Sequence, residues 1–368
     1  MRGAVESRMD NQNGSATNCS DEFPYTEEYY EELSVDVTFM ALFSLCAFLT
    51  TFLVLGFLEH VWHFHKNHEG DDKRNKQVYL LGIYPVVAVM AFLAIAVPRS
   101  TILTDLLASV YLSVAVYQFL TLTILHHGGI EGMLSKFEEQ TISFCTPPLC
   151  CVLCCLRKIP FTERTLNVLR VFVLQLVIIR PILMLTAAVL WTDGQYTPGD
   201  TSPSTPSLYI TVINAVSTLL AMYGLVVTFR SSKLHLKEER LGMKFAALQL
   251  AIVIVNLQNV IVGILATKNI PACIGMRGSK IRGSNAHHML LIVEMLLLGA
   301  LARFAYRVPF KRKLSSDCDH PKVIQENNDA KTPVDGISEQ MHDATIGRSC
   351  EKLPLVHADS FQKGHSYH

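Results

Sequence analysis

The 22 residues VTFMALFSLCAFLTTFLVLGFL, at positions 37–58, contain no charged side chain. An α-helix needs about 20 mostly apolar residues to cross roughly 30 Å of hydrocarbon, so this segment predicts a transmembrane helix. The composition of the whole chain agrees with this interpretation. Half of its 368 residues are hydrophobic and 17% are charged, which is unusual for a soluble protein.

Six further segments are long and apolar enough to span a membrane. We expect these spans at residues 78–97, 101–125, 168–191, 208–229, 245–266 and 287–306. The sequence therefore predicts an all-α membrane protein with seven transmembrane helices, which together form one domain at residues 35–310.

The distribution of Lys and Arg predicts the orientation of the chain. The connections at 59–77, 126–167 and 230–244 are rich in basic residues, whereas the connection at 192–207 has none. Because basic loops stay in the cytosol, the N-terminus is expected outside and the C-terminus inside. The connection at 267–286 disagrees, since it carries four basic residues on the predicted outer side.

The two ends of the chain differ in composition. Residues 1–34 are acidic and contain the glycosylation sequons of Asn13 and Asn18, so we expect an extracellular, glycosylated segment. Residues 311–368 are polar without a periodic apolar face, which predicts a disordered cytosolic tail. Cys19 and Cys273 are both predicted outside, where they could pair or stay as free thiols.

Two charged residues lie deep within predicted spans, Arg180 in the fourth and Glu294 in the seventh. A charge at the centre of a membrane helix costs at least roughly 2.5–3.5 kcal/mol, so such residues are functional candidates. The two lie at similar predicted depths. We expect them either to pair or to line one polar path, and a purely structural ion pair is the alternative. Arg170, Arg303 and Asp105 lie near helix ends and can reach the interface.

Neutral polar residues supply further candidates for such a path. Gln249, Asn256 and Asn259 fall within about 80° of one another on the sixth span. Asn214 lies in the fifth span, near Ser217 and Thr218. These amides and hydroxyls could face a cavity, or they could hold helices together without any ligand.

Catalytic and nucleotide-binding motifs are missing from the sequence. It contains no GxxxxGK[ST], HExxH or GxSxG pattern, so we expect no enzymatic activity and no cofactor. The net charge is zero without a basic face, which excludes nucleic-acid binding. The histidine-rich stretch EHVWHFHKNH at 59–68 is interpreted as a solvated or headgroup-facing patch rather than a metal site.

Five cysteines gather in the predicted cytosolic loop at 128–167. They are Cys145, Cys150, Cys151, Cys154 and Cys155. A disulfide is disfavoured in the reducing cytosol, and a zinc site would need a complete set of ligands. Because apolar and basic residues surround the thiols close to a membrane span, we expect S-palmitoylation, with zinc binding as the alternative.

Several longer stretches resemble one known family. They are VPRSTILTDLLASVY (97–111), the cysteine run, LQLVIIRP (174–181), TDGQYTPGD (192–200), INAVSTLLAMYGL (213–225), MKFAALQL (243–250) and LLIVEMLLLGALARFAYR (290–307). In this order they make residues 37–307 similar to the organic solute transporter alpha subunit family. Gln175 and Arg180 match the Gln and the basic position of that family.

The resemblance implies facilitated, bidirectional transport of amphipathic organic anions, such as bile acids and conjugated steroids, across the basolateral plasma membrane. It also implies a single-span beta subunit as partner, and contacts with membrane lipids and with further copies of the chain are expected. Two alternatives stay open. One is a non-transporting scaffold of the same family, and the other is a seven-span receptor, although span seven ends in RFAYRVP without an NPxxY motif.

Overall fold

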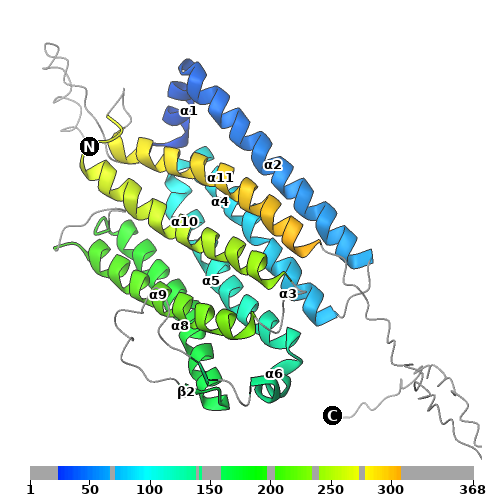
Figure 1. The fold of residues 1–368 in the computed structure, drawn as a ribbon. Helices are drawn as coiled ribbons and strands as arrows, with labels where there is room; N and C mark the ends of the chain where they lie inside the picture. The colour runs from blue at the N-terminus through cyan, green and yellow to red at the C-terminus, as the bar shows by residue number, and fades with distance from the viewer. Residues whose placement is uncertain are drawn as a thin grey trace, which may run out of the picture. The chain divides into compact units, whose positions relative to one another are not determined.

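The computed structural model describes residues 24–66, 71–137, 141–142, 159–196, 204–233, 240–272 and 278–307. Within these ranges, seven helical segments are long and apolar enough to cross a membrane, which confirms the predicted all-α fold. The spans (Figure 1) are α2 (Val37–Lys66), the consecutive helices α3 (Asp71–Leu81) and α4 (Ile83–Ala96), α5 (Thr101–His126), α8 (Glu163–Thr192), α9 (Pro206–Ser232), α10 (Leu241–Thr267) and α11 (Ser279–Tyr306).

Shorter elements precede or connect these helices. They are α1 (Thr26–Val35), the 3₁₀ turn η2 (Pro98–Ser100), α6 (Gly129–Phe137), and the two-residue strands β1 (Thr141–Ile142) and β2 (Ile159–Pro160). The strands pair antiparallel, with Thr141 opposite Pro160. This pairing joins the two described ends of the long connection between α6 and α8. The five loop cysteines, both sequons, Cys19, Cys273 and the predicted tail lie outside the described residues.

Several helices extend beyond the predicted apolar segments. Helix α2 continues to Lys66 and therefore includes His60, and α11 begins at Ser279 rather than at residue 287. Lys280 and Arg282 thus belong to the first turns of α11, and the connection predicted at 267–286 is shorter than expected. Hydropathy marks the part of a helix that lies in hydrocarbon, whereas backbone hydrogen bonding continues into the polar interface.

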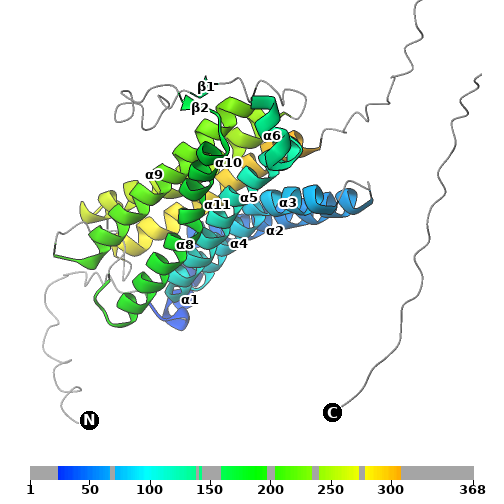
Figure 2. The ribbon, with the colours of Figure 1, turned by 90° about the horizontal axis from the view of Figure 1, so that it is seen from below.

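The helices differ strongly in how much of each is covered by protein. In the most apolar window, 61% of the α3–α4 span and 56% of α5 are buried, against 17% for α2 and for α10. Helix α4 packs against α2, α5 and α11, while α8 packs against α5 and α9. Figures 1 and 2 show α4 and α5 flanked by the other spans. The inner helices therefore form the core, and the other described helices cover little of the surface of α2 and α10.

A glycine and a proline shape the junction between α3 and α4. Pro85 has no N–H to bond with the carbonyl of Leu81, which loosens this turn. Tyr111 of α5 stacks on Tyr79, with ring centroids 4.5 Å apart, and donates a hydrogen bond to the carbonyl of Tyr79 at 2.9 Å. A Cβ atom at Gly82 would lie 2.4 Å from the Tyr111 hydroxyl oxygen, so only glycine allows this approach.

Candidate functional site

Arg180 lies on α8 in the interior of the bundle, with 2% of its surface exposed. Its guanidinium donates three hydrogen bonds to neutral oxygens on two other helices. Nε donates to Asn214 Oδ1 at 3.0 Å, and Nη2 donates to Thr218 Oγ1 at 3.0 Å and to Asn256 Oδ1 at 2.7 Å. The single side chain therefore connects α8 with α9 and α10.

Further hydrogen bonds orient these acceptors toward Arg180. Asn256 donates through Nδ2 to the carbonyl of Ile252 at 2.7 Å, which turns its Oδ1 toward the guanidinium. The Thr218 hydroxyl donates to the carbonyl of Asn214 at 2.7 Å, so its lone pairs remain for Arg180. Two of the three acceptor oxygens are thus fixed before any ligand arrives, as a preorganised site requires.

The Arg180 cluster carries an uncompensated positive charge. Its protein partners are two amides and one hydroxyl, and none of the ion pairs among the described residues includes Arg180. A guanidinium has five N–H groups, and in the described part of the chain no acceptor bonds to Nη1. A buried charge without a counter-ion is costly, so the site favours an anionic oxygen at Nη1.

Gln175 extends this polar seam along the contact between α8 and α9. Its Nε2 donates to the carbonyl of Ser217 at 2.7 Å, and the Ser217 hydroxyl donates to Gln175 Oε1 at 2.7 Å. Gln175 lies five residues before Arg180, or about 7.5 Å along the helix. The two positions matched to the family therefore both bond to α9, although no described bond joins Gln175 to the Arg180 cluster.

Glu294 of α11 does not form the predicted pair with Arg180. Its Oε1 accepts a hydrogen bond from Gln258 Nε2 at 3.4 Å, and its Oε2 is buried without a partner among the described residues. Gln258 and Asn256 are two positions apart on α10, which separates them by about 200°. Helix α10 thus contacts Arg180 with one face and Glu294 with the other. That both charges line one path stays a prediction.

The three amides predicted as a stripe on α10 have different surroundings. Asn256 contacts Arg180, whereas Asn259 is exposed and Gln249 is half-buried. Within the described ranges Gln249 Oε1 has no hydrogen-bond partner. The structure therefore brings together Arg180, Asn214 and Asn256, adds Thr218, and leaves Asn259 and Gln249 outside this cluster.

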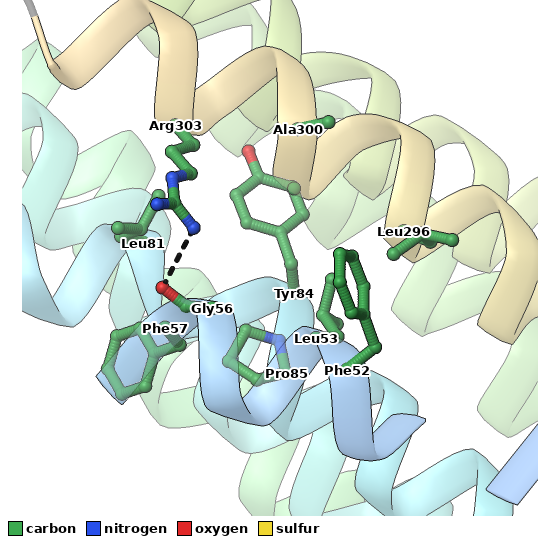
Figure 3. A pocket seen from close by; sticks show the side chains of 11 residues that line it. Phe52, Leu53, Gly56, Phe57, Leu81, Tyr84, Pro85, Leu296, Ala300 and Arg303 are labelled. Atoms are coloured by element: carbon green, nitrogen blue, oxygen red, sulfur yellow. Dashed lines mark hydrogen bonds between the residues drawn. The ribbon is translucent and has the colours of Figure 1, made fainter. Parts of the chain in front are cut away.

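A lateral groove between α2, α4 and α11 is a second candidate site (Figure 3). Its volume is about 240 Å³, and its lining consists of Phe52, Leu53, Gly56, Phe57, Leu81, Tyr84, Pro85, Leu296, Gly299, Ala300 and Arg303. Phe52 is 60% exposed, so one wall of the groove faces the surroundings of the bundle. The lining is apolar apart from the Tyr84 hydroxyl and the Arg303 guanidinium.

Charged residues form a rim at one end of the lateral groove. Arg303 Nη1 donates to the carbonyl of Gly56 at 3.2 Å (Figure 3), and its Nη2 pairs with the Glu59 carboxylate. Arg307 Nη2 lies 3.3 Å from the same carboxylate. Arg303 thus bonds to α2 from the last turn of α11, and its expected reach toward the interface stays a prediction. Two arginines and one glutamate give this rim a net charge of one positive unit.

Sequence reasoning missed a contact between α5 and α11. His288 is 2% exposed, and its Nδ1 donates to the carbonyl of Ser284 at 2.7 Å. Its Nε2 lies 3.2 Å from Asp105 Oδ1. Because a carbonyl only accepts, a hydrogen bond at Nε2 requires the His288–Asp105 pair to hold one extra proton. Asp105 was expected only to reach toward the interface.

Tyr196 lies beside this pair, just beyond the end of α8. Burial raises the pKa of its phenol, and the nearby Asp105 carboxylate raises it further. The neutral phenol is therefore the form that this site favours. One sequence feature could have predicted the His288–Asp105 contact. Asp105 lies near the start of the third span, and His287 and His288 lie at the start of the seventh.

Comparisons with known proteins agree on one family. A sequence model described as "Organic solute transporter Ostalpha" matches residues 41–311. The chain is 30% identical to organic solute transporter subunit alpha of Danio rerio, over 78% of this chain and 88% of that protein. Identity is 29% with the Leucoraja erinaceus subunit, over 79% and 85% of the two chains. It is 30% with the Homo sapiens subunit, over 73% and 79%. No solved structure matches the chain.

Proposed function

The chain belongs to the organic solute transporter alpha family, and we propose that it is the alpha subunit of a facilitated, bidirectional transporter of amphipathic organic anions. Bile acids and conjugated steroids are the substrates that we propose. The site of action is the plasma membrane, on the basolateral side of epithelial cells. A single-span beta subunit is the proposed partner. Family membership and seven apolar helices support a multi-pass membrane transporter.

The buried guanidinium of Arg180 is the observation that carries the anion part of this proposal. It lies in the fourth span with neutral partners, and its Nη1 has no acceptor in the described part of the chain. A sulfate or carboxylate oxygen would supply the missing negative charge and accept from these N–H groups. The surrounding spans are apolar and suit the hydrocarbon body of a bile acid or steroid.

Binding at Arg180 also accounts for the reversibility that we propose. Three neutral acceptors already take up part of the hydrogen-bonding capacity of the guanidinium. An arriving anion would accept from the remaining N–H groups, and after it leaves, Arg180 would keep its three bonds to the protein. A site that binds too tightly would hold its substrate, and conduction requires that a bound ion can leave. The neutral amides around Arg180 moderate its affinity for an anionic substrate. They already accept hydrogen bonds from the guanidinium, so the substrate gains only part of its hydrogen-bonding capacity.

Uptake of a labelled steroid sulfate tests the proposal. Cells would express the full chain alone, the beta subunit alone, or both, with surface labelling to confirm equal amounts of protein. We expect saturable uptake and saturable efflux only when both subunits are present. Absence of flux from cells in which the two subunits demonstrably assemble would contradict the transporter proposal and favour the non-transporting scaffold.

A further inference from the structure

We propose that the lateral groove between α2, α4 and α11 is a binding site for an anionic glycerophospholipid. One acyl chain lies along the apolar lining, and the phosphate binds at the rim formed by Arg303, Arg307 and Glu59. This inference does not depend on the proposed transport function. It concerns a different face of the bundle from the Arg180 cluster, and its test does not measure flux.

The small volume and the opening of the groove favour a ligand that is only partly enclosed by protein. Pockets that enclose a drug-sized ligand have volumes of about 300–1,000 Å³, whereas this groove has about 240 Å³. Its wall at Phe52 is 60% exposed on α2, a helix that is itself mostly uncovered. A lipid can therefore enter sideways from the bilayer and leave its second chain outside the protein.

The net charge of the rim matches a lipid headgroup that carries one net negative charge. Arg303 and Arg307 carry two positive charges and Glu59 one negative charge, so one positive charge remains. The described bonds use two of the five N–H groups of Arg303, and the others are free to donate to phosphate oxygens. Basic pockets between transmembrane helices on the cytoplasmic side are suited to lipid headgroups, and this end of the bundle is the one predicted to be cytosolic.

His60 provides an independent indication that a ligand completes this region. It is 1% exposed, and neither of its ring nitrogens has a hydrogen-bond partner among the described residues. Leu53, which lines the groove, is seven positions earlier and thus lies on the same face of α2. His60 is also close enough to Arg303 and Arg307 to interact electrostatically with them. A phosphate or ester oxygen at the rim would satisfy its N–H group.

The depth of the rim favours a resident lipid over a transported anion. Arg303 and Arg307 lie at the last turn of α11 and just beyond its end, where lipid headgroups reside. A transported anion has to leave this level and cross the hydrocarbon, whereas a phospholipid keeps its phosphate here. The apolar lining extends from the rim toward the membrane interior, in the direction that an acyl chain takes.

Native mass spectrometry of the purified full chain tests the proposal. The protein, extracted in mild detergent, would be titrated with phosphatidylserine and with phosphatidylcholine of identical acyl chains. We expect phosphatidylserine to bind at least about tenfold more tightly, because its headgroup keeps one net negative charge for the rim, whereas the quaternary ammonium of phosphatidylcholine offsets its phosphate. Ala300→Trp places an indole in the groove and should lower this affinity at least about tenfold. Leu297→Trp alters an exposed position of the same helix outside the groove and should change little.

Arg307→Gln is a second variant that keeps the proposal testable if other changes disturb folding, because Arg307 is half-exposed and lies outside the groove lining. It should remove most of the preference for phosphatidylserine. Equal binding of the two lipids by wild type would overturn the proposal, as would unchanged binding by Ala300→Trp. Displacement of phosphatidylserine by a steroid sulfate, with steroid sulfate binding lost in Ala300→Trp, would also overturn it and assign the groove to the transported anion.

Discussion

At the level of single residues, the chemistry of the bundle interior depends on one guanidinium with neutral partners. Asn214, Thr218 and Asn256 lower the cost of burying Arg180 without neutralising its charge. A carboxylate in the same place would form a stable ion pair and leave no reason for an anion to bind. The choice of amides and a hydroxyl therefore keeps the cation available.

Asn256→Leu removes the shortest hydrogen bond to Arg180 and should destabilise the folded protein. We expect a loss of about 1–3 kcal/mol, because the guanidinium loses an acceptor in a buried site. The change in thermal unfolding midpoint of the detergent-solubilised protein measures it. Asn259→Leu is the matched control, since this amide lies on the same helix, is exposed and does not contact Arg180. Equal destabilisation by both changes would contradict the network.

The sequence predicted several of these residues but not their partners. Arg180 and Glu294 stood out because each places a charge at membrane depth, and both are found inside spans. The ion pair, one of the two expected arrangements, is not formed among the described residues, because depth says nothing about rotation. Asn256 and Gln258 differ by two positions on α10, and that difference directs one toward Arg180 and the other toward Glu294. Only the packing of the helices in three dimensions determines which face of α10 contacts which neighbouring helix.

At the level of helices, close approach of α5 to the α3–α4 junction depends on Gly82. We expect Gly82→Ala to displace Tyr111 and to cost about 1–3 kcal/mol, as overpacking of a fitted contact does. Unfolding midpoints measured by fluorescence-detected size exclusion would show the loss. Gly242→Ala is the control, because a Cβ atom there meets nothing within 4 Å. A neutral Gly82→Ala would mean that the Tyr111 contact contributes little.

The His288–Asp105 contact links α5 and α11 and makes a different prediction. Asp105→Asn can still bond to His288, since its amide can donate to Nε2 while Nδ1 donates to Ser284. Asp105→Leu cannot, and it leaves a buried ring nitrogen unpaired. We therefore expect Asp105→Leu to lower stability by about 1–3 kcal/mol and Asp105→Asn to have a smaller effect. Similar unfolding midpoints for the two variants would argue against the contact.

Helix ends were harder to predict than helix positions. The seven apolar segments are all confirmed as spans, because a run of about 20 apolar residues has few other stable environments. Hydropathy did not predict that α11 begins at Ser279 or that α2 continues to Lys66. Polar residues can continue a helix or begin a loop with little difference in hydropathy. His60 was consequently placed in a solvated patch, although it is buried.

At the scale of the whole molecule, the orientation and the covalent modifications remain predictions. Removal of N-linked glycans should shift the mobility of wild type and not that of Asn13→Gln/Asn18→Gln, which would place the N-terminus outside. An unshifted wild type would remove the support that glycosylation gives to this orientation.

S-palmitoylation of the cysteine-rich loop is tested separately. Hydroxylamine should release acyl groups from wild type and not from a variant lacking Cys145, Cys150, Cys151, Cys154 and Cys155. Equal release of acyl groups from both proteins would refute S-palmitoylation of the loop.

The central claim, that the charge of Arg180 selects anions, is tested most directly by a pair of substrates that differ in one group. A steroid glucuronide carries a carboxylate, and the corresponding glucoside is neutral and of similar size. Proteoliposomes containing both subunits should take up the glucuronide at least about tenfold faster than the glucoside, and Arg180→Gln should abolish this preference. Arg170→Gln, which removes a charge from the half-exposed end of the same helix, should preserve it. An unchanged preference in Arg180→Gln would contradict the account.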